Sequence, residues 1–213
     1  MNVHLIAVLA GAGLAAMAAM AQTGNGAASK LKGKRVAILC TDGFEQPEMV
    51  EPRKALDDAG AKTTLIAPKS GQIKAWNKTD WGDKFNVDLV LDEAKADQFD
   101  ALLLPGGVIN PDKLRMNPKA VEFVKAFFAA GKPVAAICHA PIMLIEADVV
   151  RGRKLTSWPS LKTDLRNAGA SWEDSEVIVD RNLVTSRKPE DIPAFNRQMI
   201  EVFAEAKARS GAK

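Results

Sequence analysis

The chain has 213 residues, of which 47% are hydrophobic and 26% charged, and this length suits one globular domain with a sizeable core. Its net charge of +3 is too small to indicate a nucleic-acid partner, and no basic run alternates with aromatic residues. Two cysteines far apart in the sequence predict neither a disulfide framework nor a zinc-ligand cluster, and two histidines are too few for a multi-histidine metal site. No cofactor or metal is therefore expected.

The first residues have the pattern of a targeting segment. Residues 5–21 are almost wholly apolar and end in Ala19-Met20-Ala21, the small-x-small pattern that precedes a signal-peptidase cut. A cleaved leader over residues 1–21 predicts a periplasmic or exported protein that begins at Gln22. The run is short for a membrane span. Since no Lys or Arg precedes it, an uncleaved anchor and a mis-assigned start, which would leave a cytoplasmic protein, remain as alternatives. Residues 22–33 are expected to form a flexible linker.

Strand-like apolar runs alternate with helical patterns over residues 34–208, which we expect to form one domain followed by a tail over 209–213. In chain order, the expected elements are a strand at 35–40, a helix at 48–59, a strand at 62–67, a hairpin-like region at 71–91, a strand at 101–104, a helix at 119–130, a strand at 134–137, a helix at 161–168, a strand pair at 177–179 and 183–186, and a helix at 192–208. This alternation predicts an α/β fold: a doubly wound, mostly parallel sheet with helices on both faces.

Three of the predicted strand ends carry groups suited to chemistry. In such sheets the site lies outside the carboxyl ends of the strands. One end carries the segment 40–45, one carries Gly106-Gly107, and one carries Cys138-His139. Two successive glycines allow backbone N–H groups to approach a bound oxyanion closely. We therefore expect these three segments to share one site.

Cys138 is the strongest candidate for a reactive group. The apolar run 134–137 ends in this cysteine, His139 follows at once, and the next residues have the pattern of a helix start. A nucleophile at a sharp strand-to-helix turn is held out of the sheet, and the helix N-terminus beneath it favours a thiolate. His139, the only histidine outside the first four residues, is the candidate proton acceptor. The alternative is a cysteine that only packs in the core.

Four motifs in fixed order and spacing resemble one family. They are the segments 42–48 (DGFEQPE), 99–107 (FDALLLPGG), 136–141 (AICHAP) and 151–157 (RGRKLTS). With these motifs the chain resembles the PfpI family of the DJ-1/PfpI superfamily over residues 34–204. The resemblance implies a single-domain, flavodoxin-like fold related to class I glutamine amidotransferases.

The resemblance also implies a role for each matching residue. Cys138 matches the nucleophile, His139 the adjacent histidine, and Glu45 the carboxyl group that contacts the sulfur with a raised pKa. The backbone N–H groups of Gly107 and His139 match an oxyanion hole. Asp112 matches an acid, commonly Glu in the family, that a neighbouring subunit supplies to the histidine. A homodimer or hexamer is therefore expected.

By resemblance, the chain is expected to be a cysteine-dependent stress-protective hydrolase or lyase of glyoxal and methylglyoxal adducts, acting as a deglycase or a cofactor-free glyoxalase. A cysteine peptidase with the same Cys-His dyad is an alternative, and a non-catalytic redox sensor or chaperone is an alternative of another class. True class I glutamine amidotransferases place their histidine far downstream of the cysteine. No histidine follows His139 in this chain, so that activity is not expected. Ala140 replaces the usual glycine, and its methyl group either narrows the pocket or has no effect. The two thiols are expected to be free, because a Cys40–Cys138 disulfide would consume the nucleophile.

Overall fold

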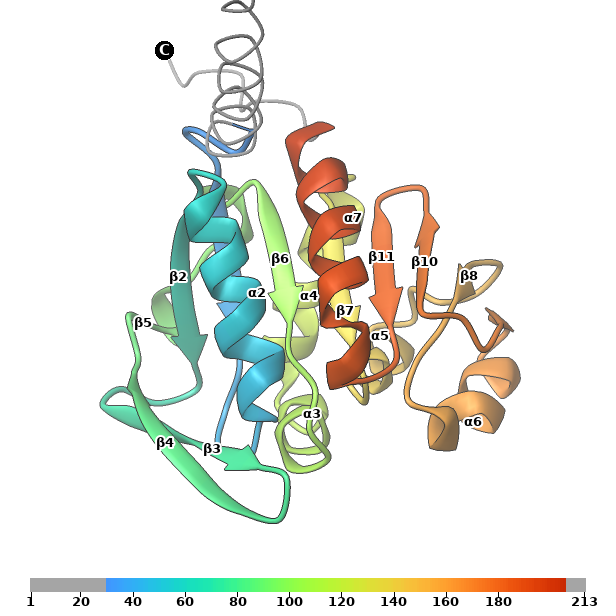
Figure 1. Cartoon of the computed structure of the whole chain (residues 1–213), viewed down its shortest axis with the longest axis horizontal. Helices are drawn as coiled ribbons and strands as arrows, with labels where there is room; N and C mark the ends of the chain where they lie inside the picture. The colour runs from blue at the N-terminus through green and yellow to red at the C-terminus, as the bar shows by residue number, and fades with distance from the viewer. Residues whose placement is uncertain (1–29, 206–213) are drawn as a thin grey trace, which may run out of the picture.

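The computed structural model describes residues 30–205. The predicted leader and most of the predicted linker lie outside the described residues. Residues 34–205 form an α/β sandwich with one central sheet (Figure 1). Within residues 30–205 no helix has both the length and the hydropathy needed to cross a membrane.

The central sheet has seven strands in the order β10-β11-β7-β6-β1-β2-β5. Every neighbouring pair is parallel except β10 with β11. Strands β1, β6 and β7 are almost continuously buried, because parallel strands are covered on both faces. The strands are β1 Arg35–Leu39, β2 Lys62–Ala67, β5 Leu89–Val90, β6 Ala101–Leu104, β7 Val134–Ile137, β10 Val177–Asp180 and β11 Leu183–Ser186.

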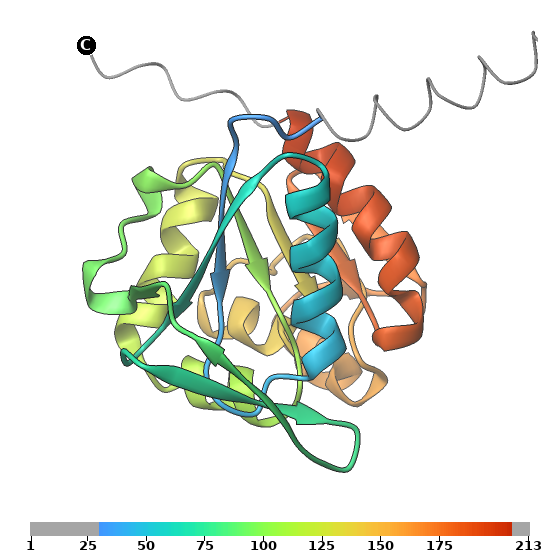
Figure 2. The ribbon, with the colours of Figure 1, turned by 60° about the vertical axis from the view of Figure 1, so that its left-hand side comes forward.

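Helices cover both faces of the sheet and enclose two hydrophobic cores. On one face lie α2 (Gln46–Asp58) and α7 (Ile192–Glu205), as Figures 1 and 2 show. Their core includes Leu56 and Phe195. The second core, which includes Phe127 and Leu144, lies under the helices of the other face. Those helices are α3 Ile109–Arg115, α4 Pro118–Ala129, α5 Pro141–Glu146 and α6 Lys162–Asn167.

Two small sheets lie outside the central one. Strands β3 (Gln72–Asn77) and β4 (Asp80–Asn86) form an antiparallel hairpin at the carboxyl edge of the main sheet (Figure 2). Strands β8 (Lys154–Leu155) and β9 (Ser171–Trp172) form a short parallel pair. Single 3-10 turns occur at Leu91–Glu93, Ala96–Gln98, Pro159–Leu161 and Pro189–Asp191.

The predicted fold and the predicted elements are confirmed within one or two residues at most ends. The structure adds α3, β8 and β9, which are too short to give a periodic pattern. It also ends the hairpin expected over 71–91 at Asn86, because Leu89–Val90 pairs with β2 in the central sheet. The last predicted helix is described only to Glu205, so its expected end at residue 208 lies outside the described residues.

Candidate active site

Cys138 lies at the turn between β7 and α5, as the sequence predicts. Its φ of 64° is left-handed, a conformation that non-glycine residues rarely adopt and that costs about 1–3 kcal/mol. The turn is held from both sides, because the Cys138 N–H donates to Ser186 O at 3.0 Å and the Trp158 N–H donates to Cys138 O at 2.8 Å. The strained backbone aims the side chain into a cavity instead of into the sheet.

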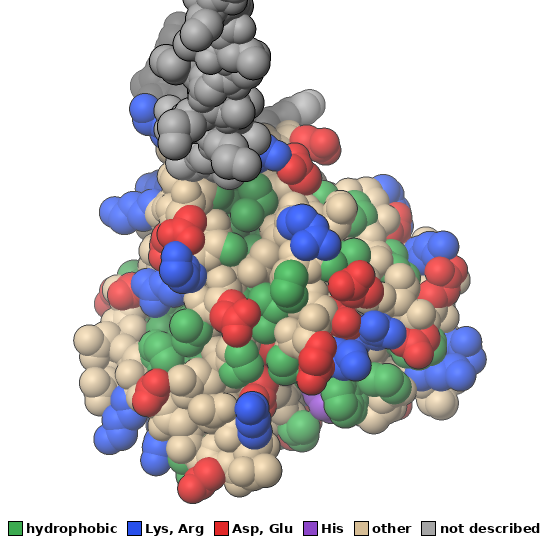
Figure 3. Space-filling view, viewed as in Figure 1, with side chains coloured by type: hydrophobic (Ala, Val, Ile, Leu, Met, Phe, Trp, Pro, Cys, Tyr) green, Lys and Arg blue, Asp and Glu red, His purple; other side chains and the backbone are tan. Residues whose placement is uncertain are grey.

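The cavity has a volume of about 600 Å³ and opens over the carboxyl ends of β1, β6 and β7. Cys138 and Glu48 lie at its base, while Trp76, Trp158 and Pro189 supply apolar wall surface. In the described chain there is one histidine, and Figure 3 shows it in purple at the surface between hydrophobic and charged side chains. This arrangement fits an apolar pocket with a few convergent polar groups.

His139 is held between the thiol and the segment that follows β8. Its Nδ1 lies 3.2 Å from Cys138 Sγ, and its Nε2 lies 3.4 Å from Ser160 Oγ. Its ring stacks on the indole of Trp158, with ring centres 5.8 Å apart and planes at 24°. Burial lowers the pKa of His139 below its usual value. The imidazole is therefore neutral near pH 7 and has a lone pair for a proton.

The carboxyl group beside the thiol belongs to Glu48, and this corrects the predicted role of Glu45. Glu48 is fully buried in the first turn of α2, and burial raises its pKa to about 8, with the Glu45 charge adding to the rise. The Cys138 thiol and the N–H groups of Gly106 and Gly107 lower this pKa, so they face the carboxyl group. Within residues 30–205 neither carboxyl oxygen makes a hydrogen bond of good geometry. Glu48 is therefore protonated at neutral pH.

A signal for Glu48 was present in the sequence. The residues of α2 that face the core include Glu48, Pro52 and Leu56, at the spacing of one helix face. A carboxyl group on the buried face of a helix is unusual, because burial without a partner disfavours its charged form. That pattern is a signal for a buried Glu48, but it does not by itself place the carboxyl group at the sulfur.

Glu45 lines the same cavity, but its carboxylate holds the β3–β4 hairpin in place. It accepts a hydrogen bond from the Lys78 N–H at 3.1 Å, at the tip of the hairpin. Next to it, Gln46 forms two hydrogen bonds with Asp83 on β4, at 2.7 and 2.8 Å. Asp42 accepts from the Lys74 N–H of β3. The acidic and amide side chains of the 42–48 motif thus fix the hairpin that carries Trp76 to the cavity.

The predicted low pKa of the Cys138 thiol is not found. Burial raises its pKa, and the neighbouring Glu48 raises it further, whereas the N–H groups of Gly107 and His139 lower it. Helix α5 is only 6 residues long and begins at Pro141, so its dipole is a weak source of positive potential. Both cysteines are free, and burial also raises the pKa of Cys40. A thiol with a raised pKa needs a nearby proton acceptor to form a thiolate, and His139 Nδ1 lies 3.2 Å from the sulfur.

The Pro-Gly-Gly turn after β6 closes tightly around the thiol. A Cβ built on Gly106 would lie 2.5 Å from Glu48 Oε2 and 2.7 Å from Cys138 Cβ. Gly107 has a φ of 78° and leaves no room for a side chain against Gly43 O and Glu45 N. Because only glycine fits here, the backbone approaches the sulfur closely enough to direct N–H groups at it.

Two further sequence expectations concern residues away from the thiol. Asp112 lies on α3 with an exposed side chain and does not line the cavity in the described chain. Its reach toward a second subunit stays a prediction. Ala140 is fully buried in the core beneath α5, so its methyl group packs in the interior and does not narrow the cavity.

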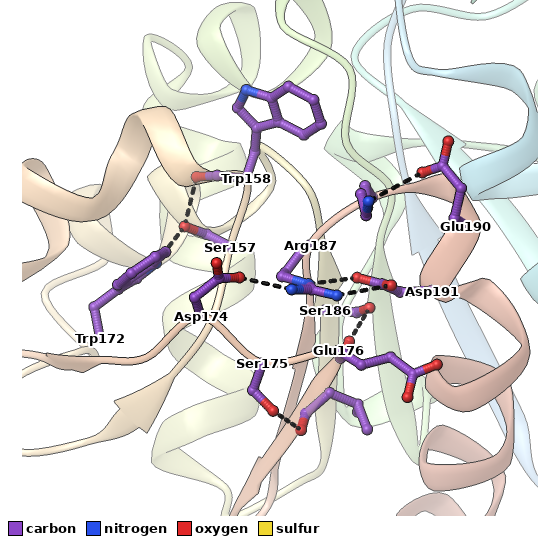
Figure 4. A network of polar contacts seen from close by, with 12 residues as sticks. Ser157, Trp158, Trp172, Asp174, Ser175, Glu176, Ser186, Arg187, Glu190 and Asp191 are labelled. Atoms are coloured by element: carbon purple, nitrogen blue, oxygen red, sulfur yellow. Dashed lines mark hydrogen bonds and ion pairs between the residues drawn. The ribbon is translucent and has the colours of Figure 1, made fainter.

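A polar network supports the wall of the cavity that follows β11 (Figure 4). Arg187 binds Asp191 through two hydrogen bonds, at 2.7 and 3.1 Å, and Asp174 through a third, at 2.7 Å. The neighbouring Ser186 hydroxyl donates to Glu176 O. The segment Lys188–Glu190 between these anchors lines the cavity. The network therefore fixes the same strand end that binds the Cys138 N–H.

Among residues 30–205 no three His, Cys, Asp or Glu side chains gather closely enough to hold a metal ion. The groups around Cys138 are instead two proton carriers and several backbone donors. Such a site can generate a thiolate and stabilise an oxyanion, which are the requirements of covalent catalysis at a carbonyl group.

Comparisons with known proteins show which family the chain resembles in sequence. The model of the DJ-1/PfpI family matches residues 34–202. The chain is 45% identical over 169 residues to a deglycase from Pyrococcus abyssi, which covers 79% of this chain and 99% of that protein. It is 44% identical over 171 residues to protein/nucleic acid deglycase 2 of Escherichia coli, which covers 80% of this chain and 98% of that protein. Relatives so named support an enzymatic, hydrolase-like activity.

Solved structures show the same fold. A two-domain protein from Anabaena variabilis, with a DJ-1/ThiJ/PfpI-like and a ferritin-like domain, matches with a TM-score of 0.76 and 35% identity over 84% of this chain and 52% of that one.

The comparisons correct one prediction. The expectation of a periplasmic or exported protein is wrong, because the relatives are deglycases that 79–80% of this chain matches over 98–99% of their own length, and the family match begins only at residue 34. The apolar residues that suggested a leader lie outside the described residues. Because the family model matches residues 34–202 and a relative is 45% identical over 169 residues, the chain belongs to the DJ-1/PfpI family.

Proposed function

We propose that this chain is a cysteine-dependent deglycase-type hydrolase that removes reactive-aldehyde adducts, with Cys138 as the nucleophile. The names of its relatives support a deglycase-type stress function. The observation that carries the proposal is the pair of proton carriers around the thiol. His139 Nδ1 lies 3.2 Å from Sγ, and the buried carboxyl of Glu48 lies on the Gly106 side of the same sulfur.

The first step is the addition of the thiol to an aldehyde carbonyl. The Cys138 proton passes to His139 Nδ1, a bond forms between Sγ and the carbonyl carbon, and the C–O π pair moves onto the oxygen. The N–H groups of Gly107 and His139 stabilise that oxygen. When the substrate is an amine adduct, its C–N bond breaks before the thiol adds. The electron pair of that bond leaves with the nitrogen, the hydroxyl proton moves to the nitrogen, and the electron pair of the O–H bond forms the carbonyl again.

The second step moves a proton between the two carbons of a dicarbonyl fragment. The hemithioacetal carbon loses its proton and the neighbouring carbonyl carbon gains one, so the first is oxidised to a thioester and the second is reduced to an alcohol. Water then cleaves the thioester, releasing a 2-hydroxy acid and the thiol. A protonated Glu48, with a pKa of about 8, can give and take a proton in this exchange.

The second proton carrier favours adduct chemistry over peptide hydrolysis. A cysteine peptidase needs one base, which returns its proton to the leaving amine. A carboxyl group with a raised pKa beside the sulfur has no task in that sequence, whereas the proton shift in a dicarbonyl needs one. A redox sensor, the alternative of another class, also needs an accessible thiol that can be oxidised, but it does not turn over a substrate.

A substrate panel tests the proposal. We expect the full chain to convert methylglyoxal adducts of N-acetylcysteine and N-acetylarginine to lactate faster than the adducts release free methylglyoxal. Cys138→Ala should abolish lactate formation, while Cys40→Ala, the matched change at the other cysteine, should retain it. Turnover by Cys138→Ala, or cleavage of unfolded casein without adduct repair, would contradict the proposal. Lactate formed no faster than spontaneous release would assign the free dicarbonyl as the substrate.

We also propose that the chain acts as a homo-oligomer through the surface around α3. Members of the family commonly act as oligomers on small or glycated substrates. Val108 and Met116 flank this helix and are 64% and 74% exposed, and Asp112 lies between them. Light scattering should give at least a dimer, and Met116→Asp should shift it toward a monomer. A monomer at micromolar concentration with full activity would refute this interface.

A further inference from the structure

His139 has a second polar partner besides the thiol, and that partner comes from the same chain. Ser160 Oγ lies 3.4 Å from Nε2, on the side of the ring opposite the 3.2 Å contact between Nδ1 and Cys138 Sγ. A neutral imidazole carries one N–H and one lone pair. If Nδ1 is to take the thiol proton, its lone pair must face the sulfur and the N–H must be on Nε2. A hydroxyl oxygen is a suitable acceptor for that N–H.

We infer that Ser160 is a positioning residue for His139: its hydroxyl accepts from Nε2–H and so keeps Nδ1 available to the thiol. The inference rests on the proposed function, in which His139 takes the Cys138 proton. The transfer leaves the ring with both nitrogens protonated, and the Ser160 oxygen then accepts from a charged donor, which is a stronger hydrogen bond than a neutral one. Ser160 thus favours the state that forms during attack over the resting state.

The segment that carries Ser160 is fixed at several points. The Trp158 N–H donates to Cys138 O at 2.8 Å, and the Leu161 N–H donates to Trp158 O at 3.1 Å. As Figure 4 shows, the Trp172 indole donates to Ser157 Oγ, which in turn donates to Trp158 O, both at 2.9 Å. The Trp158 indole stacks on the imidazole. The backbone therefore places the hydroxyl at the ring edge while the indole fixes the plane of the ring.

Other groups that share the cavity do not account for the state of His139. The pKa of His139 is lowered by burial, and no charged neighbour among the described residues adds to this shift. Asp112, the acid expected to reach a neighbour's histidine, does not line this cavity in the described chain. The charged side chains that line the cavity are Glu45, Glu48, Lys78, Lys188 and Glu190.

The test measures the titration of the His139 imidazole by NMR. The sequence has two histidines, so full-length protein labelled with ¹⁵N-histidine gives two sets of ring signals, and His4→Gln identifies those of His139. Ser160→Ala should lower the titration midpoint of His139, and Ser160→Asp should raise it by about one pH unit, because a carboxylate favours the charged ring. Ser160→Thr, which keeps the hydroxyl, should restore the wild-type midpoint. Ser175→Ala, which removes a hydroxyl that donates to Val177 O, is the control.

Activity provides an independent readout. Ser160→Ala should lower kcat for adduct repair about five-fold and leave KM unchanged, because that is the effect of losing one hydrogen bond of average net strength. An unchanged His139 midpoint in Ser160→Ala overturns the inference, whether or not activity falls. A midpoint that moves in Asp112→Asn but not in Ser160→Ala assigns the role to the neighbouring subunit and also overturns it. If the wild type repairs no adduct, the proposed function fails, but the midpoints still show whether Ser160 binds the ring.

Discussion

The most exacting prediction concerns the proton on Glu48. In the folded chain the pKa of Glu48 is raised from its ordinary value of 4.5 to about 8, chiefly by burial. Between these two pH values the unfolded chain releases this proton while the folded chain keeps it. The free energy of unfolding should therefore fall as the pH rises from 4.5 to 8 and level off above that. The slope is about 1.4 kcal/mol per pH unit and the total at most about 5 kcal/mol.

Glu48→Gln removes this dependence while keeping the volume of the side chain and a hydrogen-bond donor. Urea unfolding of the two proteins should be compared in steps from pH 5 to pH 8. We expect the free energy of unfolding of the variant, relative to wild type, to rise steadily with pH. Glu45→Gln, the same substitution at the residue that holds the hairpin, is the matched control. It should keep most of the wild-type fall, with the upper end of the fall at a lower pH, because the Glu45 charge contributes to the raised pKa of Glu48. Parallel curves for wild type and Glu48→Gln would refute a buried, protonated Glu48.

Three further predictions follow from the same site. Limited iodoacetamide at neutral pH should label Cys138 before Cys40, because Cys138 is 6% exposed at the cavity and Cys40 is fully buried; equal labelling in peptide mass spectra would contradict this. Gly106→Ala should lower the free energy of unfolding by about 1–3 kcal/mol and abolish activity, because the new Cβ would lie 2.5 Å from Glu48 Oε2. A urea midpoint equal to that of the wild type would show that the turn is looser than described. Glu45→Ala should raise KM through the hairpin and leave kcat within about two-fold; a fall in kcat of about 10²-fold, the usual effect of a lost proton carrier, would return Glu45 to the chemistry.

The sequence was sufficient for the sheet and for the cysteine turn because both depend on local patterns. Runs such as 101–104 and 134–137 are buried on both faces of a parallel sheet, so they stay apolar throughout. The abrupt end of one run at Cys138 marks the strand-to-helix turn. These features need no knowledge of how distant segments pack.

The carboxyl partner could not be chosen in the same way. Glu45 and Glu48 lie in one motif, one helical turn apart, and which of them faces the sulfur depends on how α2 is rotated against the sheet. That rotation depends on how α2 packs against elements far along the chain, such as α7 and β3. Ser160 was missed for the same reason: it follows His139 by 21 residues, and only the folded turn after β8 brings its hydroxyl to the ring.

The separateness of the β3–β4 hairpin has an evolutionary consequence. Within residues 30–205 it pairs with no strand of the central sheet. It is held instead by the bridge between its Trp76 and Glu45, the residue before α2, and it supplies one wall of the cavity. Its length and sequence can therefore change without shifting the register of the seven strands or the position of Cys138. Grafting this hairpin between members of the family is a route to exchange what the cavity admits while the machinery at its base stays intact.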